Sequence, residues 1–402
     1  MMAKSERVSF EGSQGAMLDA RLELPAGPPR AYALFAHCFS CSKNNLAATR
    51  VSKALAEHGI AVLRFDFTGL GASEGDFANT NFSSNVDDLI RAAEFLRDEY
   101  EAPSLLVGHS LGGAAVIVAA EKVPGVKAVA TIAAPADATN VTRQFAGDVE
   151  KIAREGEALV QLEGRPFTIR RQFLDDIAEA KVEDAARALK AALLIAHSPT
   201  DATVGIENAT RLFVAARHPK SFIGLEGADH LLTRREDADH AARVIAAWAE
   251  RYLPADPLPE APDAPPEKNS AVVSETGAGK FLSWAAAGQA RFLVDEPEDV
   301  GGLDAGPSPF ELLSVALAAC TTMTLRMYAG HKELELGRIT TRVKHAKEEG
   351  ADVFSRAISV EGEVPAELQD KLVEIASKCP VHRTLERGAQ IRTAYEAGST
   401  DA

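Results

Sequence analysis

The sequence Gly108-His109-Ser110-Leu111-Gly112 follows a short apolar stretch and opens a helical pattern. It fits G-x-S-x-G, the motif in which a serine lies on a tight turn from a strand into a helix. Side chains at the two glycine positions would clash in such a turn, which leaves the serine hydroxyl exposed in a strained conformation. The motif therefore predicts a nucleophile at Ser110. An ordinary strand-to-helix turn with a capping serine fits the same residues.

A serine hydroxyl needs a base to take its proton, and that base needs a carboxylate to orient it. His230 follows an apolar stretch at residues 221–225, and Asp201 follows one at residues 192–197. Both therefore fall at the carboxyl ends of predicted strands, where open α/β sheets place their sites. We expect His230 to act as the base and Asp201 to orient it, although a loop histidine and a turn aspartate fit these positions too. The neighbouring Asp229 is a poorer candidate, because a residue next to the histidine cannot easily reach its ring.

Short apolar stretches alternate with amphipathic helical patterns through the first part of the chain. The apolar stretches lie at residues 31–39, 61–67, 104–108, 128–134 and 192–197, and the helical patterns include residues 85–100 and 111–123. Strands that are apolar on both faces suit a parallel sheet covered by helices. The pattern predicts a doubly wound, mostly parallel α/β sheet. Residues 137–189 interrupt it, and we expect a mostly helical cap there, with a small polar hairpin near residues 163–168.

From about residue 7 to residue 252 the chain resembles the α/β-hydrolases. The resemblance rests on the G-x-S-x-G turn and on the order of Ser110, Asp201 and His230. It implies a carboxylic-ester hydrolase that works through an acyl-enzyme at Ser110. Peptidases and acyltransferases use the same three residues, so the acceptor of the acyl group stays open.

The same resemblance implies an oxyanion hole made of backbone amides. One amide would be that of Leu111, directly after the nucleophile, and the other that of Phe39, in the loop after the first parallel strand. The family usually has a glycine where this chain has Cys38. Cys38 and Cys41 form a C-x-x-C. A redox pair fits this spacing, but such pairs normally stand at the start of a thioredoxin-like helix, and no second pair of Cys or His stands at zinc spacing.

A proline-rich acidic segment, PADPLPEAPDAPPE, begins at residue 254. Such a composition is typical of an extended, solvated linker. It divides the chain into a first domain at residues 1–252, a linker at residues 253–271 and a second, smaller domain at residues 272–402.

The second domain contains a long apolar helix pattern. Ser308 is a good N-cap, Pro309 suits the first helical turn, and Glu311 completes a capping box. The pattern continues over residues 312–329 and is apolar on nearly every face, so we expect this helix to be central and buried. Cys320 lies in its middle, where a cysteine is most often a small apolar core residue.

Cys379 changes that interpretation. It follows a helical pattern at residues 366–378 and directly precedes Pro380, which suits the first turn of a new helix. A cysteine at a helix N-terminus beside basic residues is in a setting that favours the thiolate. The chain thus offers two cysteines for chemistry.

Residues 272–395 resemble the OsmC family, in the motif that leads to Glu311 and in the two cysteines. The resemblance implies a smaller α+β domain that reduces organic hydroperoxides with a thiol reductant. Cys320 would attack the peroxide, Cys379 would resolve the sulfenic acid as a disulfide, and Glu311 would help to order the site. The family also uses an arginine, for which Arg291 is a weak candidate. It further implies an intertwined homodimer, and an assembly or ligand-binding module with inert cysteines is the alternative.

The composition excludes several classes of partner. Lys+Arg 43 against Asp+Glu 58 gives a net charge of −15, which disfavours binding to nucleic acid and to anionic membranes. The first residues carry no apolar segment typical of a secretory signal, so we expect a cytoplasmic protein whose four cysteines are reduced. No cofactor motif and no metal-ligand spacing is present, and we expect neither group.

Overall fold

In this computed structural model the described residues are 4–395, except for 163, 256–257 and 266. They divide into two compact units. One comprises Met1–Glu260 with Thr276–Ala278, and the other Ala261–Glu275 with Gly279–Ala402.

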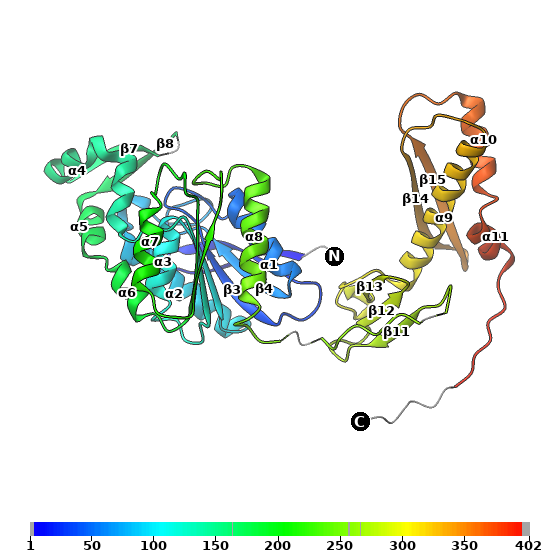
Figure 1. The fold of residues 1–402 in the computed structure, drawn as a ribbon, viewed down its shortest axis with the longest axis horizontal. Helices are drawn as coiled ribbons and strands as arrows, with labels where there is room; N and C mark the ends of the chain where they lie inside the picture. Colours follow the sequence, from blue (N-terminus) through cyan, green and yellow to red (C-terminus); the bar gives the residue numbers. More distant parts are fainter. Residues whose placement is uncertain (1–3, 163, 256–257, 266, 396–402) are drawn as a thin grey trace. The chain divides into compact units, whose positions relative to one another are not determined.

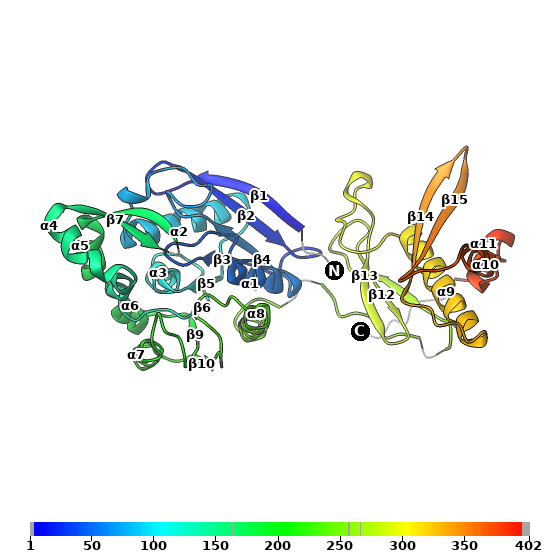
Figure 2. The same cartoon turned by 90° about the horizontal axis from the view of Figure 1, so that it is seen from above.

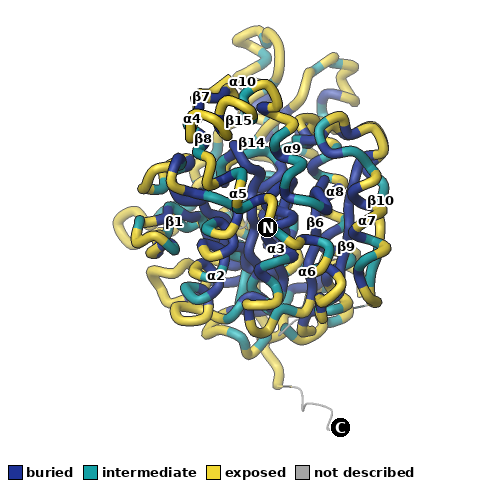
Figure 3. The backbone as a smooth tube through the Cα atoms, turned by 90° about the vertical axis from the view of Figure 1, so that its left-hand side faces the viewer, coloured by how far each residue is buried: buried dark blue, intermediate teal, exposed yellow. Residues whose placement is uncertain are grey.

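An eight-stranded, mostly parallel sheet forms the centre of the first unit, in the strand order β1-β2-β4-β3-β5-β6-β9-β10 (Figure 1). Its strands are β1 (Lys4–Glu11), β2 (Met17–Leu24), β3 (Ala31–Ala36), β4 (Ile60–Phe65), β5 (Leu105–His109), β6 (Ala128–Ile132), β9 (Ala192–His197) and β10 (Lys220–Gly224). β1 and β2 are antiparallel to their neighbours, and the other six strands of this sheet are parallel to one another. Figure 3 shows the central strands as buried, which is why their sequences are apolar on both faces.

Helices cover both faces of this sheet, as the sequence predicted. α1 (Leu46–Glu57) and α8 (Arg235–Ala249) pack side by side on one face (Figure 2). The core of the other face includes residues of α2 (Phe82–Glu99), α3 (Leu111–Ala119) and α7 (Glu207–Ala215). The doubly wound α/β fold is therefore confirmed.

The cap predicted between β6 and β9 is also present. It contains the 3-10 segment η2 (Ala138–Asp148), the helices α4 (Val149–Glu155), α5 (Arg171–Glu179) and α6 (Val182–Ala188), and the antiparallel hairpin of β7 (Glu157–Leu162) and β8 (Arg165–Arg170). The predicted hairpin region begins at Glu163, which lies outside the described residues. A further 3-10 turn, η1 (Phe77–Asn79), contacts β8.

The second unit has the α+β composition that the sequence predicted. A three-stranded sheet comprises β11 (Val272–Glu275), β12 (Ser283–Ala287) and β13 (Ala290–Val294), followed by the short η3 (Glu298–Val300). The long helix α9 (Pro309–His331) packs on the hairpin of β14 (Ile339–Glu348) and β15 (Ala351–Val360), and on α10 (Ala366–Ala376) and α11 (Pro380–Arg387).

The expectation that α9 is buried on all sides is wrong for the chain by itself. Only one stripe of the helix is buried, comprising Leu317, Thr321, Leu325 and Ala329. Met323 and Met327 are 65% and 75% exposed. The reason is that the hairpin and the two short helices cover a single side of α9. By length and composition α9 would also suit a membrane span, a test that the core helix of a water-soluble protein passes equally.

Candidate active sites

The turn between β5 and α3 has the strained geometry that the motif predicted. Ser110 has φ +56° and ψ −126°, a left-handed conformation that side chains other than glycine rarely adopt. A Cβ atom at Gly108 would overlap the backbone of Gly112, and one at Gly112 would overlap the His37 carbonyl. Glycines are therefore required on both sides of the serine, and the turn holds its hydroxyl at the edge of the sheet.

The structure brings Ser110, His230 and Asp201 together from three strand ends. His230 Nε2 lies 2.9 Å from Ser110 Oγ, and His230 Nδ1 lies 2.7 Å from Asp201 Oδ2. The other carboxylate oxygen of Asp201 accepts the amides of Thr203 and Val204, at 2.8 and 2.9 Å. Burial raises the pKa of Asp201, but the hydrogen bond and charge of His230 and these two amides outweigh it and lower the pKa. Asp201 is therefore a fixed carboxylate that can orient the histidine ring.

Asp229, the poorer candidate for orienting His230, forms hydrogen bonds within its own loop. Its carboxylate accepts the amides of Leu231 and Thr233, both at 3.0 Å, and the hydroxyl of Thr233. It therefore shapes the loop that carries His230.

Two buried histidines lie behind this group of residues. His109 Nε2 lies 2.7 Å from the carbonyl oxygen of His230, and His197 Nε2 lies 2.8 Å from that of Val204. Burial, aided by the nearby His230, lowers the pKa of His109 to about 4, and burial lowers the pKa of His197 as well. Both rings are therefore neutral at physiological pH and donate to the loops that hold the site.

The loop after β3 carries the predicted second oxyanion donor. Phe39 lies in this loop and lines the same cavity as Ser110. Leu111 is the first residue of α3, a position whose amide has no acceptor within the helix. The far side of the loop is anchored by Lys43, whose amide donates to Asp66 at 2.7 Å and whose ammonium lies 2.5 Å from the same carboxylate.

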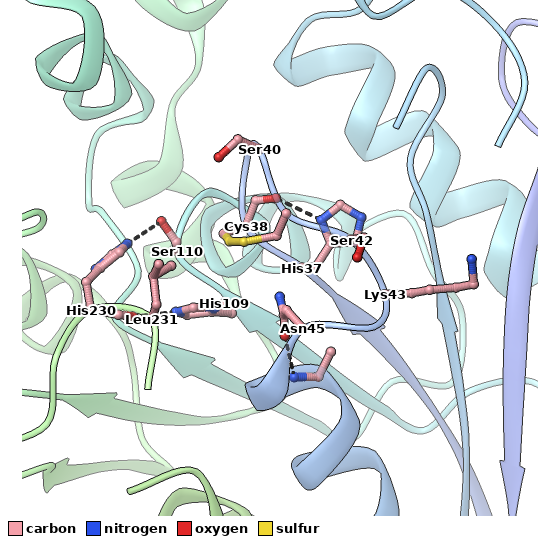
Figure 4. Close-up of a disulfide and its surroundings, with 12 residues drawn as sticks. His37, Cys38, Ser40, Ser42, Lys43, Asn45, His109, Ser110, His230 and Leu231 are labelled. Carbon is pink, nitrogen blue, oxygen red and sulfur yellow. Dashed lines mark hydrogen bonds between the residues drawn. A yellow bond between two sulfur atoms is a disulfide. The ribbon is translucent and has the colours of Figure 1, made fainter. Parts of the chain in front are cut away.

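Cys38 and Cys41 form a disulfide across this loop (Figure 4). The expectation that all four cysteines are reduced is therefore wrong for this pair. The physical reason is local: the Cys41 amide donates to the Cys38 carbonyl at 3.2 Å, and the turn places the two Cα atoms 5.2 Å apart. That separation is within the usual range for a disulfide. The C-x-x-C spacing was the signal, and only the fold showed that its two ends meet.

A cavity of about 330 Å³ opens at Ser110. Its walls come from the loop after β3, the cap and the loops that carry the other two residues of the site. The lining residues are Cys38, Phe39, Ser40, Ser110, Gln144, Gln161, Leu162, Thr203, His230 and Leu231. Substrate selection by this cavity therefore depends on the cap as well as on the sheet.

The two cysteines of the second unit are both free thiols. Cys320 is half-buried, and Cys379 is fully buried at the N-cap of α11, where its Sγ accepts the His382 amide at 3.3 Å. Cys379 Sγ also lies 3.8 Å from the hydroxyl of Thr321, on the buried stripe of α9. The helix N-terminus predicted at Cys379 is confirmed.

Glu311 forms the predicted capping box with Ser308: Glu311 Oε2 accepts the Ser308 amide at 2.8 Å, and the Ser308 hydroxyl accepts the Glu311 amide at 3.4 Å. Arg291 lies on β13 and bonds to nearby carbonyls and to Asp263, at 3.5 Å. None of these interactions involves Cys320, so the arginine of this site stays unassigned.

Sequence reasoning missed Arg356 on β15. Its guanidinium donates to the hydroxyl of Thr321 at 2.9 Å and to the carbonyl of Ala376 at 3.0 Å, beside Cys379. No sequence signal marked it, because it is one of several alternating polar residues on a hairpin. Among the residues described, no group of three or more His, Cys, Asp or Glu side chains is arranged to hold a metal ion.

Comparisons with known proteins agree with this fold. Residues 27–155 match the family described as serine aminopeptidase, S33, and residues 301–394 match the OsmC-like proteins. The crystal structure of an esterase domain from Rhodothermus marinus is 51% identical, with a TM-score of 0.51, and the match covers 62% of this chain and 99% of that domain. The chain belongs to the α/β-hydrolases and carries a C-terminal OsmC-like domain.

This α/β-hydrolase also resembles palmitoyl-protein thioesterase ABHD10, mitochondrial, of mouse, at 34% identity over 104 residues. The match covers 25% of this chain, which spans about a third of that relative's length, 34%. The solved structure of mouse ABHD10 aligns at 22% identity with a TM-score of 0.52, covering 61% of this chain and 99% of that one. This structural likeness bears on the fold alone.

Proposed function

We propose that the first domain, residues 1–252, is a serine carboxylic-ester hydrolase. The observation that carries the proposal is the chain of hydrogen bonds from Ser110 through His230 to Asp201, at the floor of an open cavity. The similar domain from Rhodothermus marinus is an esterase domain, which supports the same class of reaction.

Each residue has a step in the proposed mechanism. His230 Nε2 takes the proton of Ser110 as the oxygen attacks the ester carbonyl, and the negative charge on the carbonyl oxygen is held by the amides of Leu111 and Phe39. His230 then returns the proton to the leaving alcohol, and an acyl-enzyme remains on Ser110. In the second half of the reaction, His230 takes a proton from a water molecule as the water attacks the acyl group, and then returns that proton to Ser110. Asp201 stabilises the charged histidine throughout.

The size of the cavity favours small substrates. A volume of about 330 Å³ is near the lower end of the range for ligand pockets, ~300–1,000 Å³. We expect short or aromatic acyl groups to be accepted better than long fatty acyl groups. Thioesters form the same acyl-enzyme, and the likeness to a mouse palmitoyl-protein thioesterase makes a thioesterase the second candidate.

Two measurements test the hydrolase proposal. A fluorophosphonate should label Ser110 in the folded wild-type chain, and complete failure to label would exclude a serine hydrolase. Rates with p-nitrophenyl acetate, butyrate and palmitate, the matching thioesters and a peptide amide would then define the acceptor and the chain length. A preference for the amide would point to a peptidase instead.

For the second domain, residues 272–402, we propose cysteine-dependent reduction of organic hydroperoxides. Cys320 would attack the peroxide, Cys379 would form the disulfide, Glu311 would order the site, and an external thiol would reduce the disulfide. The match to OsmC-like proteins and the setting of Cys379 at a helix N-terminus support this. A binding or assembly module with inert cysteines is the alternative.

The exposed side of α9 supports a homodimer formed through this domain. Water-soluble monomers rarely leave apolar side chains such as Met323 and Met327 uncovered in one stripe. A second copy would cover them, and would bring its own residues to the cysteine site. The proposed cytoplasmic location and the absence of a cofactor stay predictions from the sequence.

Consumption of cumene hydroperoxide with a dithiol reductant tests the peroxidase proposal. We expect turnover by the wild type and none by Cys320→Ser, with ester hydrolysis unchanged in both. If neither consumes peroxide while both hydrolyse esters, the second domain is an assembly module.

A further inference from the structure

The disulfide beside the ester site has no role in either proposed reaction. It closes the four-residue turn from Cys38 to Cys41, which carries Phe39 and Ser40. We propose that Cys38 and Cys41 are a reversible redox site that controls the hydrolase. The disulfide holds the oxyanion loop in its working geometry, and the dithiol releases it. This inference rests on the proposed ester hydrolysis at Ser110.

The position of the pair links it directly to the reaction. Cys38 lines the cavity of Ser110, and Figure 4 shows the disulfide on the turn next to the nucleophile. Phe39, whose amide is the proposed oxyanion donor, lies between the two cysteines. A change in the turn therefore changes the aim of an amide that must point at the developing charge.

The pair can be reached without entering the ester site. Cys41 lines a second cavity of about 390 Å³, which also contains Ser42, Asn45 and Arg165. Leu231 lines both cavities. A small dithiol can therefore approach Cys41 from the second cavity, which the cationic Arg165 also lines.

The rest of the loop is anchored independently of the disulfide. On the near side, the ring of His37 hydrogen-bonds the Cys38 carbonyl at 2.8 Å. On the far side, Lys43 is fixed by Asp66. Between these anchors, the turn is held by the disulfide, by the Cys41 amide and by the guanidinium of Arg165, which donates to the Ser40 carbonyl. Reduction should therefore loosen the turn without unfolding the domain.

The chemistry balances with two named co-reactants. In reduction, a thiolate of an external dithiol attacks Cys41 Sγ, the bond between the two cysteines breaks, and Cys38 leaves as a thiolate. The second thiol of the reductant then displaces Cys41 and forms a cyclic disulfide. In oxidation, the Cys41 thiolate takes an oxygen from an organic hydroperoxide and releases the alcohol. Cys38 then displaces water from the sulfenic acid and re-forms the disulfide.

The test uses the full chain carrying Cys320→Ser and Cys379→Ser, so that only the loop pair responds. Its kcat and KM for p-nitrophenyl butyrate are measured before reduction with dithiothreitol, after reduction and removal of the reagent, and after reoxidation with cumene hydroperoxide. Differential alkylation and mass spectrometry count the thiols at the two positions. We expect kcat to fall about tenfold on reduction and recover on oxidation, with KM within about twofold, because a misaimed oxyanion donor acts in the transition state.

Two outcomes would overturn the inference: the pair is reduced by mass and kcat does not change, or the pair resists reduction in the folded chain. Cys41→Ser in the same background provides the matched variant, with a low kcat and no response to dithiothreitol expected. Failure of fluorophosphonate to label Ser110 in both states would instead remove the proposed function itself. The alkylation result reports on the pair independently of that failure.

Discussion

The two candidate sites of this chain differ in whether their functional side chains are in contact within a single chain. In the hydrolase, three side chains separated by up to 120 residues meet within hydrogen-bonding distance. In the OsmC-like domain, Cys320 and Cys379 are separate thiols, and the buried Cys379 contacts Thr321.

The physical reason lies in the scaffold. The carboxyl ends of parallel strands meet at one edge of an open sheet that helices cover on both faces, so the hydrolase residues converge within one chain. The cysteines lie on and beside a helix that has one buried and one exposed side. In the proposed homodimer, a second copy would cover that exposed side.

The largest expected effect separates the two sites. Ser110→Ala should lower kcat for ester hydrolysis by about 10⁴-fold or more, because the acyl-enzyme cannot form. Peroxide consumption should be unchanged. Cys320→Ser is the reciprocal control, and a loss of both activities in either variant would show that the sites are not independent.

The next effect tests the convergence within the hydrolase. Asp201→Asn should reduce kcat about 10³-fold, because it removes the charge that orients and stabilises His230. Asp229→Asn is the matched control. Asp229 lies on the loop that carries His230, and its substitution should change kcat only a few-fold. Steady-state kinetics on both variants decides between the two carboxylates, and equal losses would contradict the assignment.

Acid should lower the folding stability of the hydrolase domain more than that of the OsmC-like domain. The pKa of His109 is lowered to about 4 in the folded chain, whereas the unfolded chain takes up the proton near pH 6.5. Stability is therefore fully present above pH 6.5 and is lost as the pH falls toward 4. The loss is about 2 kcal/mol between pH 6.5 and pH 5 from this residue alone.

Calorimetry at pH 7 and pH 5 measures this difference between the two domains. His109→Gln keeps a donor for the His230 carbonyl and removes the titrating ring. The unfolding temperature of the hydrolase domain in this variant should therefore depend less on pH. An unchanged slope in this variant would assign the acid sensitivity to other groups.

The smallest expected effect concerns the exposed side of α9 in the OsmC-like domain. The wild type should have a solution mass of twice 42.7 kDa. Met323→Lys with Met327→Lys should shift it to a single chain, because a charge cannot be buried against a second α9 without cost. Peroxide consumption should fall about tenfold or more, while ester hydrolysis should be unchanged, because both substitutions are exposed residues of the other unit and leave the core of the hydrolase intact. Light scattering and the two assays check this, and a monomeric wild type with full peroxide turnover would contradict it.

Local sequence patterns predicted much of what was found. Apolar stretches without alternation indicated buried parallel strands, and β9 matches its predicted range at residues 192–197. The glycines around Ser110 predicted the strained turn, since no larger residue fits there. The capping box at Ser308 and Glu311 was equally readable, because it depends on residues three apart.

What the sequence determined by itself was therefore local: the elements, their order, and the chemical type of each candidate residue. Only the tertiary structure decided which side chains meet. It joined Cys38 to Cys41, placed Arg356 beside Cys379 and left one side of α9 uncovered. These outcomes depend on contacts between elements that are distant in the sequence. The type of a residue restricts which contacts it can make, but it does not specify which residue will be its partner.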